Sequence, residues 1–181
     1  MKERRKMENV IKQLKQFKID TIYEKKKHYN AAERKRKYYK LVSVGQIFLN
    51  TITGTTLLTV VLGNGSKVAE VLALVFTIVA TILASLQKVW NFEKQAQGNA
   101  KVGDMYLRIS KKTNLTLCMV KDGVLSDKEI AKRAEEIRKE ISQANELGSQ
   151  FPTISKDYKE AQEGIQNGEE NYTDRELEIW E

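Results

Sequence analysis

Two long apolar runs dominate the pattern of hydrophobic and polar positions in this chain. Residues 41–62 and residues 71–87 contain no charged side chain. The first run has 22 residues, and as a helix it would be about 33 Å long, which exceeds the roughly 30 Å hydrocarbon core of a bilayer. The second run is near the lower length limit for a span. Gly63, Asn64 and Gly65 between them favour a tight turn. The pattern predicts two membrane helices joined as a hairpin.

The main alternative is a buried helical hairpin inside a soluble protein. A helix in such a core usually keeps one face with charged residues. Neither apolar run has such a face, because each is uncharged around its whole circumference. The pattern therefore favours transmembrane helices at residues 41–62 and 71–89, joined by an extracytoplasmic turn at residues 63–70.

The segment before the hairpin is basic and predicts helix throughout. Residues 1–20 predict an amphipathic helix with the apolar stripe Met7, Val10, Leu14 and Phe17. That stripe suits either an anionic membrane surface or a neighbouring cytoplasmic helix. Thr21 with Glu24 forms a capping-box pattern, which predicts that a second helix begins there. No glycine or proline follows before the first span, so we expect the juxtamembrane segment 21–40 to continue into it.

The segment after the hairpin, residues 90–165, predicts a cytoplasmic helical region. Its first part is helix-forming but contains glycines, which lower helix propensity, so junctions are expected there. The expected helical pieces are residues 94–98 and 101–112, with glycines at positions 98 and 103 near the junction. The apolar residues 115–120 suit a continuing helix or an ordered connection, since one isolated strand would leave unpaired edges.

A second capping-box pattern, Ser126 with Glu129, predicts a helix over residues 127–147. A glycine just beyond a helix can adopt the left-handed conformation that ends it, so Gly148 is the expected C-cap. The helix is amphipathic, and its apolar stripe consists of Ile130, Ala134, Ile137 and Ile141.

The end of the chain predicts one more helix and a tail. After Pro152, which breaks the chain, a short helix is expected over residues 155–165. Residues 166–181 form an acidic segment, which predicts a loosely held tail. Its apolar residues are suited to docking on another surface: Leu177, Ile179 and Trp180. The predicted fold class is all-α, with a two-helix transmembrane hairpin, a long N-terminal helix and a cytoplasmic helical bundle.

Charge is distributed unevenly along the chain. Residues 1–40 have a net charge of +10 and residues 88–181 a net charge of −3. Because lysine and arginine collect at the cytoplasmic ends of spans, both termini are expected on the cytoplasmic side of the membrane. The basic cluster nearest the first span is expected at the lipid headgroups: Arg34, Lys35, Arg36, Lys37 and Lys40. Direct nucleic-acid binding is the weaker alternative, because these charges adjoin a span and no base-reading module surrounds them.

Polar residues inside the spans are the candidate functional residues. On a helical wheel Gln46, Asn50 and Thr53 share one side of the first span, where they either join helices or line a conduit between several hairpins. The second span has a face of small residues suited to close helix packing: Ala73, Thr77, Ala80, Thr81 and Ala84. The wheel places larger residues on the opposite, lipid-facing side: Leu74, Phe76, Ile78 and Leu83.

The sequence contains no constellation of catalytic residues, so we expect no enzyme, no cofactor and no metal site. His28 is the only histidine and is expected on a helix face. Cys118 is the only cysteine, which fits a reducing compartment, and its apolar neighbours favour packing over reaction.

Several segments resemble the SLATT families, small two-transmembrane effector domains found beside nucleotide-signalling and reverse-transcriptase-based antiviral systems of bacteria. The resemblance covers residues 21–161 and depends on four stretches: HYNAAERKRKYYKL before the first span, the Gly-Asn-Gly turn, LQKVWNFEKQAQGNAKVGDMYLRI after the second span, and FPTISKDYKEA. It implies a membrane effector that oligomerises or forms pores when a partner enzyme senses phage, with no catalytic residues.

Two functions follow from these observations. The first is a membrane effector of an antiphage defence system whose homo-oligomers form a pore or disrupt the bilayer, causing cell death or growth arrest. The second is a non-conducting membrane anchor that holds a soluble enzyme. The resemblance implies that a nucleotidyltransferase, a reverse transcriptase or another sensor protein is the partner, in addition to the lipid bilayer.

Overall fold

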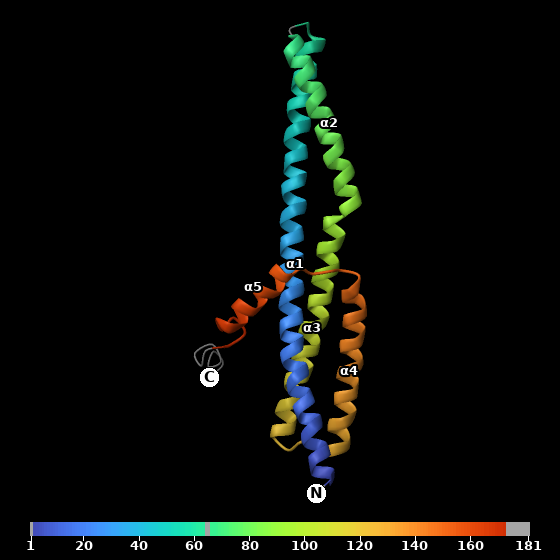
Figure 1. The fold of residues 1–181 in the computed structure, drawn as a ribbon, viewed down its shortest axis with the longest axis vertical. Coiled ribbons are helices and arrows are strands. Elements are labelled where there is room, and N and C mark those ends of the chain that lie inside the picture. Colours follow the sequence, from blue (N-terminus) through green and yellow to red (C-terminus); the bar gives the residue numbers. More distant parts are fainter. Residues whose placement is uncertain (1, 64–65, 173–181) are drawn as a thin grey trace. The chain divides into compact units, whose positions relative to one another are not determined.

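The computed structural model describes residues 2–63 and 66–172, and these residues are all-α (Figure 1). Five helices follow one another in the described residues: α1 (Lys2–Val61), α2 (Lys67–Trp90), α3 (Phe92–Lys121), α4 (Asp127–Ser149) and α5 (Ser155–Gln166). The predicted all-α class is therefore confirmed. The chain divides into two compact units. We call residues 1–32 with 98–181 the bundle, and residues 33–97 the hairpin.

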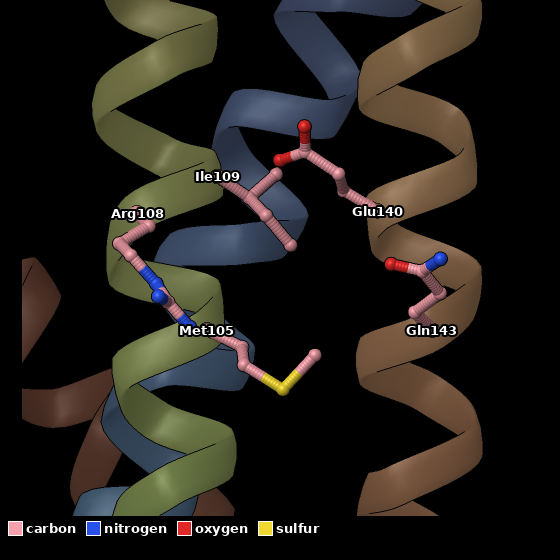
Figure 2. A pocket seen from close by; sticks show the side chains of 5 residues that line it. All are labelled: Met105, Arg108, Ile109, Glu140 and Gln143. Atoms are coloured by element: carbon pink, nitrogen blue, oxygen red, sulfur yellow. The ribbon is translucent and has the colours of Figure 1, made fainter.

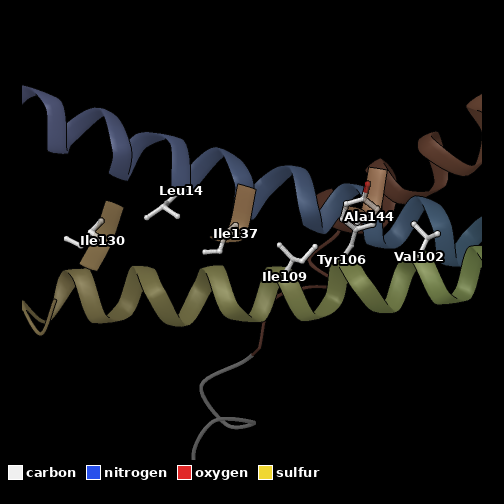
Figure 3. Packing of buried hydrophobic residues seen from close by; sticks show 7 residues of the cluster. All are labelled: Leu14, Val102, Tyr106, Ile109, Ile130, Ile137 and Ala144. Carbon is white, nitrogen blue, oxygen red and sulfur yellow. The ribbon is translucent and has the colours of Figure 1, made fainter. Parts of the chain in front are cut away.

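The core of the bundle lies between α1, α3 and α4 (Figure 3). Its buried members come from all three helices: Leu14, Val102, Tyr106, Ile109, Ile130, Ile137 and Ala144. The N-terminal stripe packs against this core, since Leu14 is fully buried and the rest of the stripe is partly buried against the cluster: Met7, Val10 and Phe17. The stripe had two predicted environments, an anionic membrane surface or a neighbouring helix, and the structure shows it packed against neighbouring helices.

The predicted helix start at Thr21 is wrong. Helix α1 continues through this position without a break, and the Thr21 side chain is only 1% exposed. Its hydroxyl donates to the carbonyl oxygens of Phe17 (2.7 Å) and Lys18 (3.0 Å) on the preceding turn. Because the hydroxyl is satisfied within the helix, it caps no new one.

The predicted break between residues 98 and 101 is also wrong, since α3 continues through it and contains both Gly98 and Gly103. Each glycine lies against an aromatic ring. A Cβ at Gly98 would overlap the Phe151 ring, and a Cβ at Gly103 would be 2.7 Å from Cε1 of Tyr29. These glycines permit close packing rather than a change of direction. The expectation of a continuing helix over residues 115–120 is confirmed by the last turns of α3.

Helices α4 and α5 agree with the residue ranges predicted for them to within two residues, but the C-cap of α4 is not Gly148. It continues to Ser149, and Gln150 in a right-handed conformation caps it. A Cβ at Gly148 would lie 3.4 Å from Nε2 of His28, so this glycine also gives room to a ring. Helix α5 begins where the Asp157 carboxylate accepts a hydrogen bond from the backbone N–H of Ile154 (2.8 Å).

Asn91 joins α2 to α3 within the hairpin. Its φ of 44° is left-handed, a conformation that asparagine tolerates better than most residues. Its backbone N–H donates to the Gln87 carbonyl, and its side-chain oxygen accepts from the backbone N–H of Lys94 (3.3 Å). One residue therefore ends one helix and caps the next.

The capping box at the start of α4 is confirmed. Ser126 Oγ accepts from the backbone N–H of Glu129 (3.4 Å), and the Glu129 carboxylate accepts from the Ser126 N–H (2.8 Å) and hydroxyl (2.6 Å). These bonds hold the pKa of Glu129 below its usual value, the bond from the Ser126 side chain contributing most.

Replacing Ser126 by alanine is expected to destabilise the bundle by about 1 kcal/mol at neutral pH, because the α4 N-terminus loses its cap. A carboxylate whose folded pKa is lowered stabilises the fold above its unfolded pKa and loses this effect as the pH falls through the folded pKa. The difference between wild type and Ser126→Ala should therefore shrink on acidification from pH 7. Unfolding monitored by circular dichroism checks this, with Ser126→Thr as the matched control. Equal stabilities at pH 7 would contradict the prediction.

Candidate functional site in the hairpin

The two long helices of the hairpin expose an unusual amount of apolar surface. Of residues 41–62 only Thr53 is buried, and in α2 only Ala73 and Ala80 are buried. Large side chains stand open on both helices, such as Leu41 at 73% and Val61 at 81% exposed. By length and composition, α1 and α2 can each cross a membrane. The exposure contradicts a buried soluble hairpin, because a core helix hides its apolar side chains.

The packed seam of the hairpin follows a seven-residue repeat. In each helix, buried or half-buried positions recur at alternating intervals of four and three residues: Val42, Gln46, Leu49, Thr53, Thr56 and Val60 in α1, and Ala69, Ala73, Phe76, Ala80, Leu83 and Gln87 in α2. A period of 3.5 is typical of helices that coil around each other. The expectation that Phe76 and Leu83 face lipid is wrong, because a wheel drawn at 3.6 residues per turn drifts from this seam.

Two of the predicted polar residues, Gln46 and Thr53, lie in the seam. The Gln46 Nε2 and Thr53 Oγ1 atoms are buried and have no hydrogen-bond partner among the described residues. Gln87, by contrast, donates from Nε2 to the Ser43 hydroxyl at 2.9 Å across the hairpin. The hydrogen-bonding groups of the seam are therefore not all satisfied, and each buried polar atom without a partner costs roughly 1–3 kcal/mol.

Asn50 does not join Gln46 and Thr53. Its side chain is exposed on the outside of the hairpin, near the middle of the apolar segment. The neighbouring exposed threonines satisfy their hydroxyls on their own helix, as Thr51 does on the Ile47 carbonyl (2.8 Å) and Thr59 on the Thr56 carbonyl (2.7 Å). No such local bond is formed by the Asn50 amide within the described part of the hairpin. The Asn50 amide is therefore a polar group that faces the surroundings of the hairpin.

The small face of α2 divides between the seam and the outside. Ala73 and Ala80 are buried in the seam. Thr77, Thr81 and Ala84 remain exposed, and both threonines bond to carbonyls of their own helix at 2.8 Å. Small residues let helix backbones approach closely. The exposed part of this face is thus suited to a further helix.

The basic cluster before the first span is not one uniform surface. Arg36, Lys37 and Lys40 are exposed and Arg34 is half-buried, whereas Lys35 is only 5% exposed. Lys37 forms an ion pair with Glu33 at 2.8 Å, and this hydrogen bond lowers the pKa of the Glu33 carboxyl.

Aromatic rings gather at the base of the hairpin. Phe92 packs against both Tyr38 and Trp90, with ring centroids 5.8 Å and 5.5 Å apart. The guanidinium of Arg34 lies 5.9 Å from the centre of the Tyr38 ring. Amphipathic rings at such a position are typical of a membrane interface.

The bundle contains two further residues that the sequence singled out. His28 lies on a helix face as expected, and this face of α1 is buried: its Nδ1 is 2.9 Å from Oδ1 of Asn99 and its ring stacks on Tyr106. Cys118, expected to pack, is exposed. No group of three potential metal ligands occurs among the residues that the structure describes.

A shallow cavity of about 270 Å³ lies between α3 and α4 (Figure 2). Side chains of both charges and a methionine line it: Met105, Arg108, Ile109, Glu140 and Gln143. The Glu140 carboxylate binds Lys112 Nζ at 2.7 Å, and this bond raises the pKa of the Lys112 ammonium. The one carboxylate among the described residues that line this cavity is therefore already paired with a cation.

These features define a class: an α-helical protein with a helical bundle and two long apolar helices that can span a membrane. Residues 10–176 match the SMODS and SLOG-associating 2TM effector domain family 4, and the chain belongs to this family. The resemblance to two-span effectors is thereby confirmed, and the chain is a membrane effector domain of defence-associated systems. No curated protein and no solved structure matches the chain.

Proposed function

We propose that this effector acts by assembling copies of its hairpin in the bacterial inner membrane, where the assembly permeabilises the bilayer and arrests or kills the infected cell. The observation that carries the proposal is the exposed amide of Asn50 near the middle of the first span. Hydrocarbon offers this amide no hydrogen-bond partner. A second copy does, because an amide both donates and accepts.

Assembly also gives the other exposed small and polar groups a role. The outer face of α2, with Thr77, Thr81 and Ala84, permits close approach of a neighbouring hairpin. Several hairpins that meet through their Asn50 faces place amides along a shared axis, where water replaces lipid. One hairpin encloses no such path, so the function requires an oligomer.

The unequal charge of the chain supports an orientation with both termini in the cytoplasm. Residues 1–40 carry a net charge of +10, and lysine and arginine near a span favour the cytoplasmic side. The bundle then faces the cytoplasm, where a nucleotidyltransferase, a reverse transcriptase or another sensor protein can reach it. The bundle receives the signal in this arrangement and the hairpin acts on the membrane.

Dye release from vesicles tests the proposal. The purified full chain is reconstituted into vesicles of phosphatidylethanolamine and phosphatidylglycerol at increasing protein-to-lipid ratios. Release should rise more steeply than the first power of the ratio, because several copies form one permeable unit. A fully inserted chain that releases no dye at any ratio would contradict the proposal and favour an anchor that holds a soluble enzyme.

A further inference from the structure

An apolar groove with a basic rim lies on the bundle between α1 and α3. It has a volume of about 420 Å³, and the side chains that line it are Ile11, Lys15, Leu117, Cys118, Val120 and Lys121. Aliphatic side chains form most of its surface, and both lysines are exposed. None of the described residues that line this groove has a carboxylate, so the groove is suited to an apolar segment that carries negative charge.

A second hollow of about 670 Å³ shares Ile11 and Lys15 with the groove and adds Lys12 on its basic side. Glu8 and Asp127 also line this hollow. Among the residues that the structure describes, negative charge therefore lies next to the groove but not within it. A ligand with carboxylates is favoured over Lys15 and Lys121 and disfavoured over the second hollow.

The last described residues after α5 bind α1. Glu170 binds Lys25 of α1 with 2.6 Å between Oε2 and Nζ, and Glu169 forms an ion pair with Lys26. Lys25 and Ile11 are fourteen residues apart on α1, which corresponds to about 21 Å along the axis and about 40° around it. The two positions therefore lie on nearly the same side of the helix.

The remaining residues, 173–181, lie outside the described part of the chain, and their composition complements the groove. Four of them are acidic and one is basic, and the apolar ones are Leu177, Ile179 and Trp180. Trp180 follows Glu170 by ten residues, so an extended chain reaches up to about 33 Å from the Lys25 ion pair. That length exceeds the distance along α1 to Ile11.

We infer that the groove is the docking site for the acidic tail of the same chain. Leu177, Ile179 and Trp180 fill its apolar floor, and the carboxylates of the tail face Lys15 and Lys121. The ion pairs of Glu169 and Glu170 direct the tail toward the groove and raise its local concentration there. The docked tail covers Cys118.

The sole cysteine gives a direct test, because Cys118 lines the groove. The rate of its reaction with fluorescein maleimide is measured in detergent for the full chain and for a chain that ends at Tyr172. The shortened chain should react at least about fivefold faster, since reaction in the full chain requires undocking. A full-length variant with Leu177→Ser, Ile179→Ser and Trp180→Ser, which keeps length and charge, should react at the same higher rate. Equal rates for all three chains would overturn the inference.

Two further measurements separate this inference from simpler explanations. The ratio of the maleimide reaction rates of the shortened and full chains should not change on dilution. A ratio that falls would show that a second copy supplies the tail, and would overturn docking within one chain.

In a full-length Trp90→Phe variant, Trp180 is the only tryptophan. The fluorescence emission of Trp180 should shift to longer wavelength when Lys15→Glu and Lys121→Glu are added, because these changes repel the acidic tail and Trp180 then leaves the apolar groove. An unchanged emission would overturn the inference without any truncation.

Discussion

Replacing Asn50 by leucine is expected to lower dye release from vesicles at least tenfold while the chain still inserts. The reason is that the Asn50 amide is exposed on the hairpin, and in the proposed assembly its hydrogen-bond partners come from other copies. An interhelical hydrogen bond in lipid contributes about 1–2 kcal/mol in model peptides, and 1.4 kcal/mol already corresponds to a factor of ten. Leucine removes this bond at each interface of the oligomer and makes the isolated span more compatible with hydrocarbon.

The matched control for Asn50→Leu is Thr51→Val. Thr51 is also polar and exposed, but its hydroxyl bonds to the Ile47 carbonyl of its own helix, so its loss should leave release within about twofold. Flotation of vesicles on a density gradient confirms insertion of each variant. Undiminished release from inserted Asn50→Leu would refute the role of this amide in assembly.

Replacing Gly98 by alanine is expected to destabilise the bundle by about 1–3 kcal/mol, in the range of an overpacked core. The new methyl group would overlap the ring of Phe151, which packs against the buried core. Alanine favours the helix over glycine by about 1 kcal/mol, but the displaced ring outweighs this gain. Unfolding of the full chain in detergent, monitored by circular dichroism, measures the effect.

A double-mutant cycle with Phe151→Ala makes this prediction specific. Once the ring is absent, Gly98→Ala should be neutral or stabilising, so the two changes should show a coupling free energy of at least about 1 kcal/mol. Gly54→Ala serves as the control, because a Cβ there meets nothing within 4 Å. Additive effects of Gly98→Ala and Phe151→Ala would show that the ring does not set the requirement for glycine.

The sequence predicts well those helices that depend on the residues of their own segment. A run of 22 uncharged residues is unusual in a soluble protein, and the Ser126 capping box is followed directly by the amphipathic stripe of α4. The same kind of motif misleads at Thr21, where burial against the bundle holds α1 helical on both sides. A capping pattern is local, and tertiary packing decides whether it is used.

The features that the sequence did not predict depend on contacts between distant segments. Gly98 is read as a junction unless Phe151, more than fifty residues later, is known to lie against it. Gln46 and Asn50 are neighbours on a wheel, and only the seven-residue repeat of the packed seam places one inside and the other outside. The groove around Cys118 exists only because α1 and α3 pack together.

The two long apolar helices differ in how they are joined to the helix beyond them. Helix α1 continues without a break from Lys2 through the first apolar run to Val61, whereas α2 ends at the left-handed residue Asn91 before α3 begins. Because an unbroken ladder of backbone hydrogen bonds resists twisting, a torque applied to the N-terminal part of α1 reaches the segment that carries Asn50. The backbone bonds of Asn91, which lie outside any helical ladder, absorb part of a torque that passes between α2 and α3.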